Sequence, residues 1–127
     1  MFETKQVPDT AEAYAPDGSE VRPLLRCSGG SMAHFRLAAN QISRAIRHRT
    51  VDEIWYIVAG QGEMWRAYGE ISALEPLKPG TALTIPCGTT FQFRAANDHA
   101  LEAIAITLPP WPGNDEACIV PGYWPVA

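Results

Sequence analysis

The sequence predicts an all-β fold of about nine short strands, arranged as a sandwich or barrel. The chain of 127 residues suits one compact domain, and its 46% of hydrophobic residues is typical of a globular protein. Its 10 glycines and 11 prolines are spread along the chain, which favours many turns and disfavours long helices. We therefore expect a single domain over 1–127, with a core barrel at about 20–108 and an arm at 109–127.

Runs of β-branched and aromatic residues, separated by glycine and proline turns, mark the expected strands. They lie at 20–27, 31–38, 42–49, 53–58, 63–67, 71–74, 82–85, 89–94 and 101–107. Gly60-Gln61-Gly62 is a tight hairpin signal between two of these runs. Only Thr10–Tyr14 offers a helical turn. The proline-rich segment 109–127 predicts an extended arm that lies on the barrel.

The charge and the apolar runs exclude two classes of partner. The net charge is −4 and no basic run is present, so we expect no nucleic-acid partner. Met1–Thr10 carries charged residues and no apolar run, so it is not a signal peptide. Every apolar stretch is far shorter than the ~20 residues that span a bilayer, and we expect no membrane partner. The number of cysteines is odd and they lack CxxC spacing, which predicts reduced thiols in a cytoplasmic protein. They are Cys27, Cys87 and Cys118.

Two stretches carry a recognisable pattern. Residues 46–62 read IRHRTVDEIWYIVAGQG, and residues 80–91 read GTALTIPCGTTF. Together they resemble the two motifs of the cupin superfamily, and the resemblance extends over roughly residues 35–108. It implies a small single-domain cupin of the cupin-2 type. The implied fold is a double-stranded β-helix, or jelly-roll barrel, with extended N- and C-terminal arms.

The resemblance also implies where a metal would bind. Metal-binding cupins usually supply three histidines and one glutamate, but here Ile46 occupies the first histidine position and Phe91 the last. Only His48 and Glu53 match the ligand pattern, whereas catalytic metal sites usually need three protein ligands. A third ligand for a divalent metal ion would have to come from His34, His99, Cys87 or Gln92.

The same positions predict an acid–base centre. His48 and Glu53 would line the barrel mouth and exchange protons with a ligand, with or without a weakly held divalent metal ion. Ile46, Trp55 and Phe91 would bound the pocket. Arg44 lies on the same face as His48 in the expected strand at 42–49, and its guanidinium could bind a carboxylate or phosphate. The other interpretation of Arg44 is an arginine at the barrel edge that reaches water.

The register after Gly88 has two solutions. In one, Phe91 and Phe93 face the pocket. If the strand is slipped by one residue, Thr90, Gln92 and Arg94 face it instead, and Gln92 becomes a ligand-binding residue.

We expect a cupin that acts on a small molecule as an isomerase, lyase or cyclase. The alternative is a non-catalytic cupin that binds or senses a small molecule, and a metal-dependent oxygenase is the least favoured reading. The apolar replacements favour a small, partly apolar or aromatic acid as the ligand. The resemblance implies a homodimer that pairs through an exposed sheet.

Overall fold

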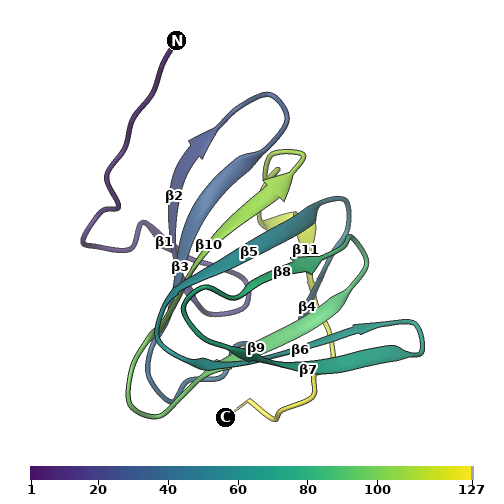
Figure 1. The fold of residues 1–127 in the computed structure, drawn as a ribbon. Coiled ribbons are helices and arrows are strands. Elements are labelled where there is room, and N and C mark those ends of the chain that lie inside the picture. Colours follow the sequence, from purple (N-terminus) through teal and green to yellow (C-terminus); the bar gives the residue numbers. More distant parts are fainter. Residues whose placement is uncertain (127) are drawn as a thin grey trace.

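The computed structural model describes residues 1–126, which form two antiparallel sheets that face each other (Figure 1). The six-stranded sheet has the order β1 (Ala13–Tyr14), β2 (Glu20–Arg26), β3 (Ser31–Leu37), β10 (Leu101–Leu108), β5 (Asp52–Ala59) and β8 (Ala82–Ile85). The five-stranded sheet has the order β11 (Ala117–Ile119), β4 (Ile46–His48), β9 (Thr90–Ala95), β6 (Gly62–Tyr68) and β7 (Ile71–Leu77). Within residues 1–126 the sole helical element is the 3₁₀ turn η1 (Asn114–Glu116). The expected all-β double-stranded β-helix is confirmed.

Strand β5 shows why these residues form strands. Its burial alternates strictly, with Glu53, Trp55 and Ile57 buried and their neighbours exposed. Successive side chains of a strand point to opposite faces, so one set enters the space between the sheets. β10 lies between β3 and β5 and pairs with both along nearly its whole length.

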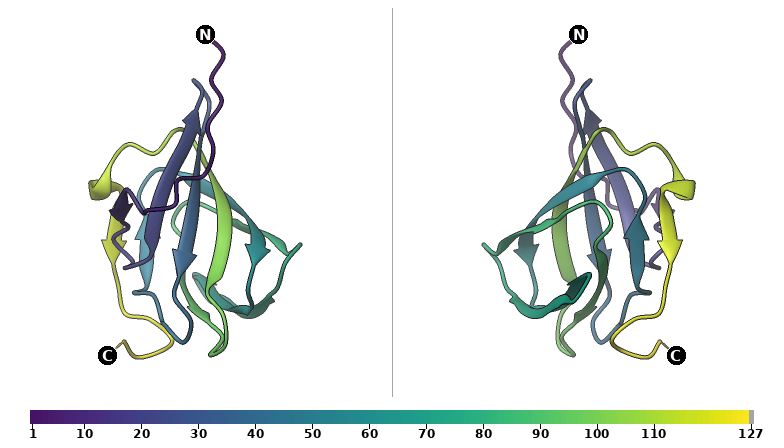
Figure 2. Two further views of the ribbon diagram at one scale, coloured as in Figure 1. Left: turned by 90° about the vertical axis from the view of Figure 1, so that its left-hand side faces the viewer. Right: turned by 90° about the vertical axis from the view of Figure 1, so that its right-hand side faces the viewer.

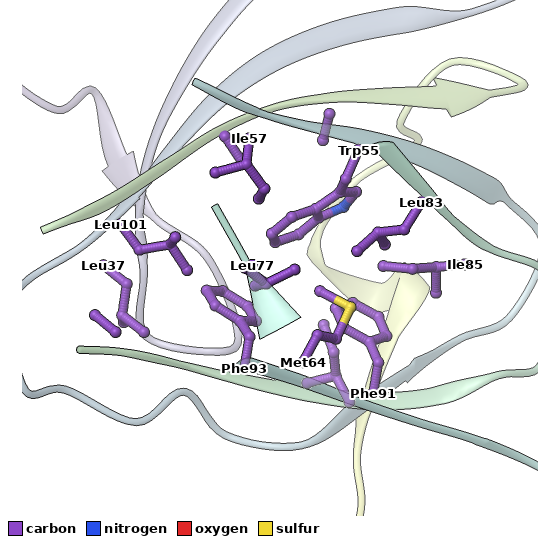
Figure 3. Packing of buried hydrophobic residues seen from close by; sticks show 14 residues of the cluster. Leu37, Trp55, Ile57, Met64, Leu77, Leu83, Ile85, Phe91, Phe93 and Leu101 are labelled. Atoms are coloured by element: carbon purple, nitrogen blue, oxygen red, sulfur yellow. The ribbon is translucent and has the colours of Figure 1, made fainter. Parts of the chain in front are cut away.

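The core fills part of the space between the sheets. Figure 3 shows side chains from the two sheets meeting there, including Trp55 and Ile57 from one sheet and Phe91 and Phe93 from the other. The Trp55 ring meets the Phe93 ring edge-on, with the ring centroids 5.0 Å apart. Each such side chain contributes about 1.5–3 kcal/mol when it leaves water, so this cluster is the main stabilising element.

The glycine turn after β5 differs from the expected hairpin. β5 pairs with β10 and β8, whereas β6 pairs with β7 and β9, so the turn carries the chain from one sheet to the other. Gly60 has φ 78°, and a Cβ there would lie 2.0 Å from the carbonyl oxygen of Ala100. Only glycine permits this close crossing.

Two further expectations are wrong. Thr10–Tyr14 is not helical, because the Glu12 N–H bonds the Val21 carbonyl at 3.2 Å and draws the segment onto β2. The strand expected at 42–49 is limited to β4. Its first part makes only an isolated bridge between Ile42 and Arg94.

The C-terminal arm lies along the five-stranded sheet, where β11 forms the edge beside β4 (Figure 2, yellow). The side-chain amide of Gln92 fastens the end of this arm. Its Nε2 donates to the carbonyls of Ser43 and Trp124, and its Oε1 accepts the N–H groups of Tyr123 and Trp124, each at 2.9 Å. Gln92 therefore points away from the inter-sheet space, which settles the register in favour of an inward Phe91 and Phe93. No helix within residues 1–126 is long and apolar enough to cross a membrane.

Candidate functional site

A cavity of about 470 Å³ lies between the sheets, beside the packed core. Five of the residues proposed from the sequence line it together, namely Ile46, His48, Glu53, Trp55 and Phe91. All five side chains are at least 95% buried. The structure thus brings these residues to one place, and their chemical roles are considered below.

Strand geometry explains the convergence. Glu53 and Trp55 are two residues apart on β5 and share its inner face. Ile46 and His48 share the inner face of β4, and Ile46 lies directly opposite Phe91 of β9. The acidic and imidazole side chains therefore approach each other from the two opposing sheets.

His48 and Glu53 form a close pair. His48 Nδ1 lies 3.0 Å from Glu53 Oε2, and each residue is only 4% exposed. The carboxylate lies off the axis of the ring N–H, so this contact is an ion-pair approach without a well-aligned hydrogen bond. Phe91 and Trp111 contact the imidazole edge-on, with centroids 5.4 and 5.2 Å from its own. These rings fix the orientation of the imidazole.

The other carboxylate oxygen of Glu53 has its own partner. Trp55 Nε1 donates a hydrogen bond of 3.1 Å to Glu53 Oε1. The indole thus holds one oxygen, and the second oxygen remains directed at His48. A buried carboxylate needs such a donor, because burial without a partner is costly.

A second acid, Glu116, stands close enough to His48 to influence its charge. Its carboxylate accepts the Thr50 N–H at 2.6 Å, the Thr50 hydroxyl at 2.5 Å and the Val51 N–H at 2.9 Å. Burial alone would raise the pKa of Glu116, but these hydrogen bonds, with a smaller effect of His48, outweigh it and lower the pKa. Glu116 is therefore a fixed negative charge near His48.

A third acid, Asp17, lines the cavity itself and is 4% exposed. Burial raises the pKa of Asp17, and the negative charge of Glu53 raises it further. Hydrogen bonds from Ser19 and the proximity of His48 act in the opposite direction, and burial prevails. In the sequence, Asp17-Gly18 is a turn signal and carries no sign of a functional role.

A polar row crosses the six-stranded sheet at one end of the cavity. In the strand register, Arg26 is level with Ser31, Ser31 with Thr107, and Thr107 with Glu53. The hydroxyls of Ser31 and Thr107 hydrogen-bond each other, and Ser31 Oγ accepts the Trp111 N–H at 2.9 Å. Arg26 is exposed and lines the cavity at this end. Among the described residues, Arg26 is the one arginine or lysine that lines this cavity.

Two proposed ligand-binding residues lie elsewhere. Arg44 is exposed and does not line the cavity. The chain before β4 is not a strand, so Arg44 does not share the inner face of His48 as expected. Its environment fits the alternative of a water-reaching arginine. Gln92 is buried beneath the C-terminal arm, with both amide atoms already bonded.

The residues present do not fit a three-ligand metal centre. Among residues 1–126, no three His, Cys, Asp or Glu side chains gather closely enough to hold a metal ion. His34 bonds Glu102 at 2.9 Å on the far face of its strand, and exposed His99 pairs with Asp98. The Cys87 thiol donates to the carbonyl of Arg49 at 3.2 Å. None of the four candidates for a third ligand, Gln92 included, joins His48 and Glu53, and no chemical step is assigned to a metal here.

A family model described as a cupin domain matches residues 33–107. No curated protein matches the chain.

Among solved structures, the chain resembles an uncharacterized conserved protein with a double-stranded β-helix domain from Klebsiella pneumoniae subsp. pneumoniae. The TM-score is 0.73 at 12% identity, covering 96% of this chain and 100% of that one. KdgF from Halomonas sp. gives a TM-score of 0.70 at 15% identity, covering 87% and 97%. The capsular polysaccharide assembling protein CapF from Staphylococcus aureus gives 0.70 at 13% identity, covering 80% and 32%. At these identities the likeness establishes the fold alone.

Proposed function

Because this chain belongs to the cupin domain family, whose fold encloses a ligand-sized cavity here, we propose that it acts on a small molecule by proton transfer. The reaction class is that of an isomerase, lyase or cyclase. The observation that carries the proposal is the approach of His48 and Glu53, both buried, across one cavity.

His48 is the proton-exchanging group in this proposal. Its Nδ1 lies against Glu53, so Nε2, on the other side of the ring, is the nitrogen that would meet a ligand. When His48 takes a proton it becomes a cation, and the Glu53 carboxylate stabilises that cation at short range. Glu53 therefore positions and supports the imidazole, and His48 touches the ligand.

The cavity walls favour an apolar or aromatic ligand. Ile46, Phe91, Trp55 and Trp111 supply them. A ligand ring that covers ~100 Å² of such surface would gain about 2–3 kcal/mol. The hydroxyls of a bare sugar would lose water there without enough partners.

An anionic group on the ligand would meet Arg26. This exposed arginine lies at the end of the cavity where the polar row runs. A guanidinium binds carboxylates through paired hydrogen bonds. The ligand class we propose is a small, partly apolar or aromatic acid with its acidic group toward Arg26.

The experiment is a turnover screen in deuterated water. Aromatic keto acids and sugar acids are incubated with the native protein, and proton NMR detects product formation or loss of carbon-bound protons. His48→Gln should abolish any activity, and Arg44→Gln, outside the cavity, should retain it. Activity that survives in His48→Gln would contradict the proposal.

The second candidate is a non-catalytic cupin that binds or senses the same ligand class. The apolar pair Ile46 and Phe91, at positions where metal-binding cupins place histidines, supports it. Ligands that bind tightly by calorimetry and are never altered would select this reading. A metal-dependent oxygenase is not proposed, because the side chains do not fit its metal.

We also propose a homodimer. The outer face of β5 exposes Ile54, Tyr56 and Val58 in alternate positions, each 41–51% exposed. A contiguous apolar row on a sheet is typical of an interface.

A further inference from the structure

Asp17 is held in the cavity by a tight turn. The Ala15 N–H bonds the Ser19 carbonyl at 2.8 Å, and the Gly18 N–H bonds the Ala15 carbonyl at 2.9 Å. Gly18 has φ 96°, a conformation that favours glycine. The Arg44 N–H bonds the Asp17 carbonyl at 2.8 Å and ties the turn to the chain before β4. The carboxyl group is therefore positioned by backbone contacts on both sides.

The hydrogen bonds of the Asp17 carboxyl converge on one oxygen. Oδ1 accepts the Ser19 N–H at 2.8 Å and the Ser19 hydroxyl at 2.6 Å. Within residues 1–126, no hydrogen bond reaches Oδ2. This arrangement fits a neutral carboxyl group, because its carbonyl oxygen can accept both hydrogen bonds and its hydroxyl oxygen keeps one proton to donate.

The charges around Asp17 favour the neutral form. No lysine or arginine of the described chain contributes to its environment, whereas Glu53 adds a like charge. The other charged or titratable side chains that line the cavity are Glu3, Tyr14, Arg26 and His48. Burial and the charge of Glu53 both raise the pKa of this carboxyl. A buried neutral acid of this kind recurs at sites that donate protons.

We propose that Asp17 is the proton donor of the cavity, acting on a carbonyl oxygen of the ligand. This rests on the proposed role of His48 and adds the complementary acid. The ligand class follows from the pair: an enolisable keto acid with an apolar or aromatic substituent.

The step balances within the site. His48 Nε2 takes a proton from the carbon next to the carbonyl, and the electron pair of that C–H bond forms a C=C bond. The carbonyl π electrons move to oxygen, which receives the proton of Asp17 Oδ2. The enol, an imidazolium and an Asp17 carboxylate result. Asp17 then takes back the enol proton as His48 returns its proton to a ligand carbon: the original carbon restores the keto form, and the far carbon of a C=C bond conjugated with the enol gives an isomer, without an oxidant or a co-reactant.

The first test is independent of turnover. Carbon-13 NMR of the aspartate carboxyl groups, with Asp17→Asn used to assign the resonance, follows the titration of Asp17 in the unliganded full chain. The expected midpoint is above the ordinary aspartate range. A midpoint within or below that range would overturn the assignment and leave the proposal for His48 intact.

The second test uses phenylpyruvate as the probe. Proton NMR in deuterated water measures exchange of its methylene protons above the spontaneous rate. Asp17→Asn keeps an oxygen for Ser19 and loses the acidic proton, and it should slow exchange at least ~100-fold, the low end of the ~10²–10⁴ typical of an acid or base. Asp52→Asn is the matched control, because Asp52 also accepts a backbone N–H, that of Cys87, but lies on the exposed surface.

Each outcome of the second test decides something. Fast exchange in native protein and Asp52→Asn, with loss in Asp17→Asn and in His48→Gln, supports the pair. Loss in His48→Gln alone overturns the role of Asp17 and leaves the proposed function standing. No exchange in the native protein overturns the keto-acid class.

Discussion

The indole N–H of Trp55 hydrogen-bonds the carboxylate of Glu53, two residues earlier on the same strand, at 3.1 Å. This bond selects the oxygen that faces His48, because the other oxygen is already engaged. Trp55 is thus a positioning residue as well as a core residue, and its ring also packs against Phe91 and Phe93. The link between core and site makes several outcomes predictable.

Trp55→Phe should keep the aromatic packing and remove the hydrogen bond to Glu53. The loss leaves a buried charge with one donor fewer, so we expect a destabilisation of about 1–3 kcal/mol in urea unfolding. Trp65→Phe is the control, since Trp65 is only partly buried and lies outside the cavity. Equal stabilities of the two variants would show that the bond to Glu53 contributes nothing.

Arg26→Gln should weaken binding of an aromatic acid and leave its neutral analogue unaffected. An exposed charge pair contributes about 0.2–1 kcal/mol, so the Kd for benzoate should rise by about 1.4- to fivefold. Calorimetry with benzoate and benzyl alcohol measures the difference at low salt. Arg44→Gln is the matched control and should change neither Kd. If Arg44→Gln raised the Kd for benzoate and left that for benzyl alcohol unchanged, Arg44 and not Arg26 would be the residue that contacts the anion.

The native protein should hold well under one equivalent of any transition metal after purification without added metal. Only His48 and Glu53 match the ligand pattern, and Ile46 and Phe91 pack against each other across β4 and β9. The double variant Ile46→His with Phe91→His should bind zinc or nickel, measured by calorimetry and elemental analysis, whereas His99→Gln should change nothing. Stoichiometric, tightly bound metal in the native protein would contradict this reading of the site.

Stability should depend on pH in opposite senses at Asp17 and Glu116. The pKa of Asp17 is raised in the folded state, mainly by burial, so its contribution is present at acid pH and is lost as pH rises through the folded value. Asp17→Asn should therefore gain stability relative to native protein as pH rises.

The pKa of Glu116 is lowered by the Thr50 and Val51 hydrogen bonds, despite burial. Its contribution is present above the ordinary glutamate range and is lost as pH falls through the folded value. Glu116→Gln should be destabilised most at neutral pH, by on the order of 2 kcal/mol. Urea unfolding at several pH values measures both variants, and parallel curves for native and variant proteins would refute the assignments.

Tyr56→Lys should convert the proposed homodimer to a monomer. It places a charge at the centre of the apolar row Ile54, Tyr56 and Val58. Sedimentation or light scattering gives the mass, and Tyr68→Lys, on the other sheet, is the control because Tyr68 is also exposed. If the native protein were monomeric at high concentration, the proposed homodimer would be contradicted.

Local spacing was enough to predict part of the site. Glu53 and Trp55 share a face because strand side chains alternate, and the motif predicted that His48 lines the same pocket. The same rule failed for Arg44, because the chain between Ile42 and Ile46 is not a strand. Alternation applies only where the strand is continuous.

The remaining site residues depend on contacts that no local pattern encodes. Asp17 reaches the cavity through a turn held by Arg44, far along the chain, and Glu116 is held near His48 by its bonds to Thr50 and Val51. Asp17-Gly18 is a turn signal in the sequence, but that signal does not encode the direction of the Asp17 side chain. The place of Arg26 at the cavity depends on the register between β2 and β3, which pairs it with Ser31.

The pairing of β4 with β11 sets the order in which the molecule can assemble during synthesis. β4 has only three residues, and both of its partners, β9 and β11, are made later, since His48 pairs with Ala117 and Ile46 with Phe91. Such long sequence separations slow folding, because the intervening chain must close before the contacts form. β5 gains both of its partners, β8 and β10, before β11 is made, so Glu53 and Trp55 can adopt their places while β4, which carries His48, still lacks its pairing with β11. The half of the site that carries the imidazole is therefore completed last, and nascent chains that stop short of β11 should lack it.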